Sequence, residues 1–408
     1  MIAQLLQDPG LAQVLSALPQ ARIVGGAVRD ALLSLAVVGA PGTDIDLATP
    51  DTPEQIIAAL GRAGLRAIPT GLAHGTITTI SHHRPFEITT LRRDIATDGR
   101  HATVAWTDDW RLDAARRDFT INAMSLSRDG TVHDYFGGTA DLQAGHVRFV
   151  GDAATRIAED YLRILRFFRF FARYGTGAPD KEATTAIAAG VAGLAQLSAE
   201  RVWHELKNIL AAPDPSQAIA LMAELGVLAA ILPEGTDLAR ACSMIAAGAP
   251  ADPLLRLAAL LTGDAEAVAT RLRFSTQEQT RLVALRAGPV PTLLGDGPEW
   301  RRLLADEDNA LLADRTWLAA GFGPDWDAVR ARLLAMPRPA FPLEGRDALA
   351  LGATPGPEIG LALRETRAWW MQMGCTPTKD ACLNELKSRL EISAGGGVPP
   401  PPDPPSIL

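Results

Sequence analysis

Two aspartates separated by one residue stand in the segment TDIDLAT, near the beginning of the chain. Because alternate residues of a strand face the same side, Asp44 and Asp46 would present their carboxylates together. Neighbouring carboxylates repel each other unless a cation lies between them, and Mg²⁺ binds through a few carboxylates plus phosphate oxygens of a ligand. The pair therefore predicts a magnesium site in a protein that acts on a phosphorylated substrate. The alternative is an Asp-rich turn without a metal.

A second segment, IVGGAVRDALL, precedes these aspartates. Its β-like residues lead into a Gly-Gly pair, and an amphipathic helical pattern follows. Glycine lets a backbone approach a phosphate closely, and a helix N-terminus offers unpaired N–H groups. Gly26 and Arg29, which adds a fixed positive charge one turn later, are therefore candidate phosphate-binding residues. A plain turn before a helix is the alternative.

The third segment is EDYLRILRFFRF at 159–170, in which arginine recurs at every third position behind a carboxylate. If the segment is one helix, each step of three residues turns about 300°, so Asp160 and the arginines form a slanted ridge. Arginine is the residue that forks onto phosphates and base edges. Arg163, Arg166 and Arg169 therefore predict a nucleotide-binding surface. The alternative is an Arg–Asp network that only ties two parts of the protein together.

The elements that would position these residues change in type along the chain. Short β-like runs (ARIVGG, TDIDLAT, GTITTI and FEITTL) separated by turns fill the first part, and helical spacing of apolar residues begins at about residue 152. The last residues are rich in glycine and proline and are expected to be disordered. We predict a mixed α+β fold with a head at 1–140, a helical neck at 141–215, a helical body and tail at 216–392, and a disordered end at 393–408.

Composition narrows the class of protein. The chain has 408 residues, 47% of them hydrophobic, and a formal net charge of −8, so a polyanionic partner would need a local basic surface. The three cysteines lack the spacing of a zinc site or a disulfide framework, which fits a reducing compartment. We find no secretory signal and no apolar run long enough to span a membrane. We therefore expect a cytoplasmic protein without a membrane partner.

Taken in order, these segments resemble the motifs of a known family. The segments GGAVRD, DID, RRDFTINAMSL, DYFGG and EDYLRILRFFRF resemble the class II, bacterial-type tRNA nucleotidyltransferases, or CCA-adding enzymes, and their poly(A) polymerase relatives. ERVWHELKNIL at 200–210 resembles the last motif of that family. The resemblance implies a polymerase-beta-like head with a small β-sheet, followed by an all-helical neck, body and tail.

The resemblance also implies roles for residues of the head. Asp44 and Asp46 would hold two Mg²⁺ ions, which activate the RNA 3′-hydroxyl and neutralise the leaving pyrophosphate. Gly26 and Arg29 would hold the triphosphate, and Arg117 would reach the same nucleotide, with a surface ion pair to Asp118 as its alternative. Glu87 stands where this superfamily often has a third carboxylate, and a solvent-facing glutamate is the alternative there.

In the neck, the family uses Asp160 and Arg163 as a protein template for the incoming base. Cytosine and adenine both present an amino donor beside a ring-nitrogen acceptor, whereas guanine and uracil present the reverse. A carboxylate that accepts from the amine and a guanidinium that donates to the ring nitrogen would admit C and A and reject G and U. Arg166 and Arg169 would support the base or the triphosphate.

The implied function is template-independent addition of the 3′-terminal CCA to tRNA from CTP and ATP. The helical region would bind the acceptor stem and elbow, and no obligatory protein partner is evident. The segment LRRDIATDGRHATVAWTDDW at 91–110 resembles the flexible loop that A addition requires. Full CCA addition and A-only addition both remain open. A poly(A) polymerase is disfavoured by a C-terminal segment without Lys or Arg, and a noncatalytic RNA- or nucleotide-binding relative is the alternative from another class.

Overall fold

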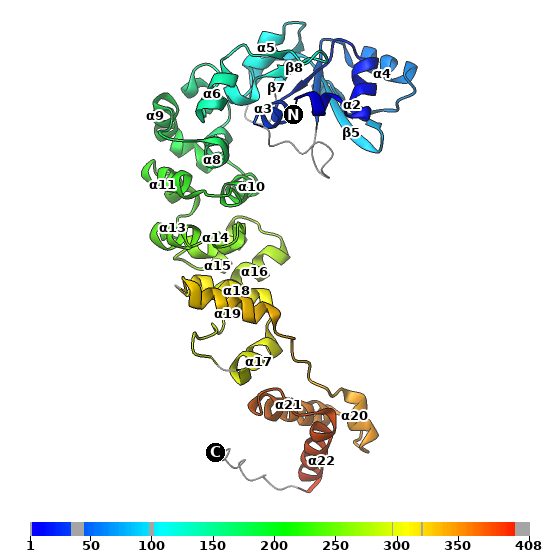
Figure 1. Cartoon of the computed structure of the whole chain (residues 1–408), viewed down its shortest axis with the longest axis vertical. Helices are drawn as coiled ribbons and strands as arrows, with labels where there is room; N and C mark the ends of the chain where they lie inside the picture. The colour runs from blue at the N-terminus through cyan, green and yellow to red at the C-terminus, as the bar shows by residue number, and fades with distance from the viewer. Residues whose placement is uncertain (1, 34–44, 98–101, 296, 320, 396–408) are drawn as a thin grey trace. The chain divides into compact units, whose positions relative to one another are not determined.

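The computed structural model describes residues 2–33, 45–97, 102–295, 297–319 and 321–395 (Figure 1). The chain forms two compact units, the first from Met1–Leu238 with Ala251–Ser275 and the second from Ala239–Pro250 with Thr276–Leu408. The first unit carries the β-sheet and the second is helical, which makes the fold mixed α+β as predicted. Among the described residues, no helix is long and apolar enough to cross a membrane.

Within the described residues, the head of the first unit contains a seven-stranded sheet in the order β3-β4-β5-β2-β1-β8-β9. Neighbouring strands are antiparallel except β2 and β5, which are parallel. The strands are β1 (Arg22–Val24), β2 (Asp46–Thr49), β3 (Ala67–Gly71), β4 (Thr76–Ser81), β5 (Arg84–Thr90), β8 (Ser125–Leu126) and β9 (Val132–His133). The four β-like runs of the sequence therefore correspond to β1, β2, β4 and β5, and those predictions are confirmed.

The sheet is covered by helices because alternate strand residues are apolar. Phe86 and Ile88 of β5 and Ile77 of β4 are fully buried. α2 (Pro9–Ala17) and α4 (Pro53–Arg62) pack against β4 and supply buried leucine and isoleucine side chains to this core (Figure 1). Burial of one large apolar side chain contributes about 1.5–3 kcal/mol. This core fixes the central strands whose ends carry the polar residues described below.

Further elements complete the head. A separate antiparallel pair, β6 (Arg92–Thr97) and β7 (Ala102–Trp106), occupies most of the segment that resembles the A-addition loop. The residues between the two strands, 98–101, lie outside the described part of the chain. Besides α2 and α4, the head contains the helices α1 (Ile2–Leu6), α3 (Gly26–Leu32), α5 (Trp110–Ala115) and α6 (Gly138–Ala144).

The helical neck joins the head through an aromatic core. α8 (Leu162–Tyr174) buries Phe167, Phe168 and Phe171, and Phe119 from the head packs among them. The ring centroids of Phe119 and Phe170 lie 5.2 Å apart. Because rings from both sides share one core, α8 is held in a defined position relative to the sheet. The remaining helices of this unit are α7 (Ala153–Glu159), α9 (Lys181–Gly190), α10 (Ala199–Leu210), α11 (Ser216–Glu224), α12 (Val227–Ile231), α14 (Pro253–Leu260) and α15 (Ala265–Arg271).

The second unit is helical and has two apolar cores of its own. One is built around Trp300 and Leu333, and the other around Trp370 and Leu386. Its helices are α13 (Leu238–Ala246), α16 (Thr276–Arg286), α17 (Gly297–Asp306), α18 (Asn309–Leu318), α19 (Pro324–Ala335), α20 (Gly345–Ala350), α21 (Pro357–Gln372) and α22 (Lys379–Gly395). α22 thus extends into the segment predicted to be disordered from residue 393, and residues 396–408 lie outside the described part.

Candidate active site

A cavity of about 750 Å³ opens in the first unit between the head and α8. Its lining combines glycines and charged residues from the head with arginines from the neck. Eight of the residues singled out in the sequence line it: Gly26, Arg29, Asp46, Arg117, Asp160, Arg163, Arg166 and Arg169. The structure therefore brings these residues to one place, although they are spread over much of the first unit. Asp44 lies outside the described residues.

The acidic end of the cavity lies at the start of β2. Asp46, which begins this strand, is paired in register with Val24 of β1 on one side and Glu87 of β5 on the other. Residues paired across adjacent strands point to the same face, and both Asp46 and Glu87 are exposed. Carboxylate oxygens are the preferred ligands of Mg²⁺. The donor type at Asp46 therefore fits a divalent cation. Glu87 is the next carboxylate on the sheet but is exposed and does not line the cavity, so its role as a further ligand stays a prediction.

The glycine turn lies beside Asp46, because Val24 is paired with Asp46 and is the last residue of β1 before Gly25. Gly25 has a φ of 70°, a left-handed conformation that glycine adopts without strain. A Cβ atom on Gly25 would lie 3.4 Å from Nη1 of Arg117, and one on Gly26 would lie 3.5 Å from Nη2 of Arg29. Two guanidinium groups therefore approach the backbone of this turn, which is a suitable arrangement for a polyphosphate.

Both guanidinium groups are held by neighbouring side chains. Arg29 is only 7% exposed, donates from Nη1 to Oδ1 of Asn122 at 2.7 Å, and lies over the ring of Tyr174 at 4.2 Å. Arg117 pairs with Asp113 at 3.3 Å, so the alternative of a surface pair with Asp118 is wrong. Burial lowers the pKa of Arg117, and Asp113 opposes that effect. Both arginines are thus fixed in direction before any ligand binds.

The prediction of one continuous helix over 159–170 is wrong. α7 ends at Glu159 and α8 begins at Leu162, with Asp160 in an extended conformation (φ −158°, ψ 108°). Oδ1 of Asp160 accepts a hydrogen bond from the backbone N–H of Leu162 at 3.0 Å. An aspartate can satisfy a backbone donor at a helix start in this way, which favours a break over continuation. Asp160 therefore lies outside the ridge.

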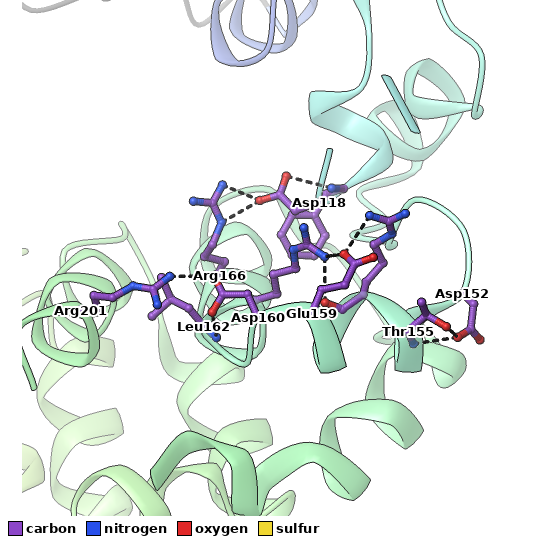
Figure 2. A network of polar contacts seen from close by, with 11 residues as sticks. Asp118, Asp152, Thr155, Glu159, Asp160, Leu162, Arg166 and Arg201 are labelled. Carbon is purple, nitrogen blue, oxygen red and sulfur yellow. Dashed lines mark hydrogen bonds and ion pairs between the residues drawn. The ribbon is translucent and has the colours of Figure 1, made fainter. Parts of the chain in front are cut away.

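The three arginines of the ridge do lie on α8, and each has a separate carboxylate partner. Figure 2 shows the pair of Arg166 with Asp118. The partners come from three different elements, so the ridge connects α7, the head and α10. The pairs are Arg163 with Glu159, Arg166 with Asp118 (Nε to Oδ2, 2.7 Å) and Arg169 with Glu205 (Nη1 to Oε2, 3.0 Å). The same arginines therefore do two things. They form the ion-pair network between head and neck that was the alternative interpretation, and they line the cavity.

Asp160 pairs with a residue that the sequence did not single out. Nη2 of Arg201, on α10, donates to Oδ2 of Asp160 at 2.7 Å (Figure 2). Glu205, one turn further along α10, is 2% exposed and holds Arg169. Both residues belong to the segment ERVWHELKNIL, and their spacing of four residues on one helix was the signal that could have identified them.

Asp118 carries the ion pair between head and neck. It is 9% exposed, and burial alone would raise its pKa. Arg166 opposes this effect, with hydrogen bonds from Asn122 and the backbone of Phe119, so the pKa of Asp118 is below its ordinary value. The carboxylate therefore stays ionised at neutral pH and keeps Arg166 directed along the cavity.

We expect Asp118→Asn to destabilise the first unit by about 1–3 kcal/mol at pH 7, because Arg166 would lose its counter-charge while partly buried. A carboxylate with a depressed pKa contributes stability above its unfolded pKa and loses it as the pH falls through its folded pKa. The difference in the free energy of unfolding between wild type and variant should therefore narrow below about pH 4. Urea unfolding at several pH values measures it.

Glu200→Gln is the matched control, because Glu200 pairs with Arg273 through side chains that are 52% and 71% exposed. Exposed ion pairs contribute little, so this variant should unfold almost as the wild type does. If Asp118→Asn and Glu200→Gln were equally stable at pH 7, the structural role of Asp118 would be wrong.

Comparisons with known proteins find relatives that match most of the chain. Residues 21–148 match the model of the poly A polymerase head domain, and residues 178–238 match that of the probable RNA and SrmB-binding site of polymerase A. The mitochondrial CCA tRNA nucleotidyltransferase 1 of Mus musculus is 38% identical over 90% of this chain and 86% of its own. The CCA-adding enzyme of Levilactobacillus brevis is 31% identical over 84% and 87%.

A solved structure extends the comparison to three dimensions. The CCA-adding enzyme of Bacillus stearothermophilus, solved in complex with CTP, superposes with a TM-score of 0.73. It shares 25% sequence identity over 96% of this chain and 100% of its own. Together with the identity of 38% over most of the mouse protein, these matches show that the chain belongs to the CCA tRNA nucleotidyltransferase family.

Proposed function

We propose that this protein adds the 3′-terminal CCA to tRNA, taking the nucleotides from CTP and ATP and releasing pyrophosphate. The observation that carries the proposal is one cavity with three parts: a carboxylate end at Asp46, a glycine turn held by Arg29 and Arg117, and a polar pair at Asp160 and Arg163. These parts suit a metal, a triphosphate and a base. The names of the mouse and Bacillus relatives support the same substrates.

The carboxylates at the start of β2 would hold the metal. Asp46 and Asp44 are the proposed ligands, with Glu87 as the further carboxylate next to Asp46 on the sheet. Two bound Mg²⁺ ions would activate the RNA 3′-hydroxyl and neutralise charge on the leaving pyrophosphate. The protein's part is to orient these oxygens, and the register of β2 with β5 sets Asp46 and Glu87 side by side.

The remaining residues of the cavity would bind and select the nucleotide. The triphosphate would lie along the glycine turn, where Arg29 and Arg117 offer planar donors at fixed positions. The base would meet Asp160 and Arg163, which accept from an amine and donate to a ring nitrogen. That pattern admits C and A, and no RNA template is needed to specify them. Arg166 and Arg169 would support the nucleotide from the same helix.

Full CCA addition is favoured over A-only addition, because the relatives matched over most of their length are CCA-adding enzymes by name. We propose that the helical region binds the acceptor stem and elbow of tRNA by shape and phosphate contacts. The cysteine pattern is the one observation that supports a cytoplasmic site of action. The mouse relative is named as mitochondrial, so the compartment remains a proposal.

Primer extension tests the proposal. The protein would be incubated with Mg²⁺ and three tRNA transcripts, ending before CCA, after C and after CC, each with CTP, ATP, both, GTP or UTP. We expect completion of CCA on all three, with GTP and UTP ignored. A single A added only to the CC-ending transcript would indicate an A-adding enzyme, and long A tails a poly(A) polymerase. Nucleotide binding without incorporation would leave the noncatalytic relative.

A further inference from the structure

We propose that Arg201 is a specificity-determining positioning residue, which sets the direction of the Asp160 carboxylate so that it accepts from the amino group of C or A. The inference rests on the proposed function and deepens it. The observation that carries it is the pair of donors on Asp160: Arg201 binds Oδ2 at 2.7 Å and the backbone N–H of Leu162 binds Oδ1 at 3.0 Å (Figure 2).

The two donors fix the carboxylate without using up its capacity. Each carboxylate oxygen can accept two hydrogen bonds, so one acceptor site remains on Oδ1 and one on Oδ2 of Asp160. The bond to Leu162 alone would leave the carboxylate free to turn about its own axis. With Arg201 bound as well, both oxygens have set positions, and the remaining acceptor directions are set with them. The incoming amine therefore meets an acceptor that is already oriented.

The orientation that Arg201 gives to Asp160 decides which group of a base the carboxylate meets. A carboxylate can only accept hydrogen bonds, so it can pair with the amino group of C or A and has no proton to donate to the carbonyl oxygen of G or U. The carboxylate therefore provides the preference for an amine, and Arg201 provides the direction in which that preference acts.

The position of Arg201 is itself held by packing. α10 packs along α8, and Glu205, four residues after Arg201, binds Arg169 of α8. Two ion pairs of opposite polarity, Arg201 with Asp160 and Glu205 with Arg169, therefore hold α10 against the start and middle of α8. The side chain of Arg201 is 30% exposed and lines the cavity, so it reaches Asp160 from a fixed helix.

The experiment compares CTP with its analogue that lacks the 4-amino group, pyrimidin-2-one ribonucleoside triphosphate. Addition of one nucleotide to a tRNA ending before CCA gives kcat/KM for each. We expect Arg201→Ala to lower kcat/KM for CTP by about 10- to 100-fold, as for the loss of one charged hydrogen bond, and to leave the analogue almost unchanged. The ratio of CTP to UTP should fall by a similar factor.

The ratio of two substrates in one preparation does not depend on the folded fraction, so a poorly folding variant still gives an answer. Arg201→Lys should recover part of the ratio, because an ammonium can still donate to Oδ2 of Asp160. In an Asp160→Ala background, Arg201→Ala should cause no further loss of the ratio. Glu200→Gln, the neighbouring exposed position on α10, is the control expected to match wild type.

An equal loss for CTP and the analogue would overturn the inference, because it would mean that Arg201 contacts the triphosphate or the RNA directly. An unchanged ratio in Arg201→Ala would overturn it as well. Failure of the proposed function has a different signature, since the wild-type protein would then add neither C nor the analogue to tRNA.

Discussion

Replacement of Asp46 by asparagine is expected to abolish nucleotide addition while CTP binding persists. The amide keeps the size of the side chain but loses the charge that attracts a divalent cation. Two-metal sites stabilise the transition state by several kcal/mol, and each 1.36 kcal/mol is a factor of ten, so we expect a loss of about a thousand-fold or more. Single-turnover addition of C to tRNA measures the rate, and equilibrium binding of labelled CTP measures affinity.

The fold should tolerate this change, because Asp46 is an exposed residue at the end of β2 and its strand pairing uses the backbone. Glu87→Gln, on the next strand at the same register, is the graded comparison and should cost less if Glu87 only assists. An Asp46→Asn protein that retained a tenth of wild-type activity with unchanged metal dependence would contradict the assignment.

The central strands and the residues on them could be predicted from the sequence because their signals are local. β5 alternates buried Phe86 and Ile88 with exposed Glu87, and a turn at 82–83 precedes the strand. β8 and β9 contain two residues each, which is too short for any alternation to be visible. The buried residues of α8 could likewise be predicted, since only isoleucine, leucine and phenylalanine stand between Arg163, Arg166 and Arg169.

The partners of those arginines could not be predicted, because they depend on tertiary packing. Asp118 lies 48 residues before Arg166, and Arg201 lies 41 residues after Asp160. The break at Asp160 was missed for a related reason. The apolar pattern continues through the segment and gives no sign of a break. The break is seen only in the structure, where Asp160 is extended and its side chain accepts from the backbone N–H of Leu162.

Burial also assigns basic residues that composition leaves open. Arg256 is 2% exposed and donates to the carbonyl oxygens of Leu210, which ends α10, and of Ala212 and Pro213 just after it. Such a residue satisfies backbone acceptors at a helix end and is not available to RNA. A count of positive charges in the helical region therefore overestimates the surface that could meet a tRNA backbone.

Replacement of Arg163 by alanine is expected to remove most of the discrimination against UTP and GTP. A site built to hydrogen-bond a particular group discriminates strongly against ligands that lack it, because its own polar atoms are then left unpaired. Without Arg163, nothing at that point donates to the ring nitrogen of C or A or clashes with the ring N–H of U or G. We expect the ratio of kcat/KM for CTP over UTP to fall by about 100-fold or more. Competition between the two nucleotides on one tRNA measures it.

Arg163 also binds Glu159, so a loss of activity alone would not separate base selection from a structural role. Arg156 supplies the control, because its Nη1 binds the same Glu159 carboxylate at 3.0 Å from α7. Arg156→Ala removes one ion pair of Glu159 and leaves Arg163 in the cavity lining. We expect it to change stability slightly and selectivity not at all.

Arg163→Lys separates charge from geometry. The ammonium of lysine can pair with Glu159, but it lacks the planar fork that addresses a ring nitrogen and a carboxylate at once. We therefore expect a variant that folds like wild type, adds CTP more slowly and selects poorly against UTP. If Arg163→Lys kept full selectivity, or if Arg156→Ala lost as much of it as Arg163→Ala, the arginine would act through Glu159 and the base would be selected elsewhere in the cavity.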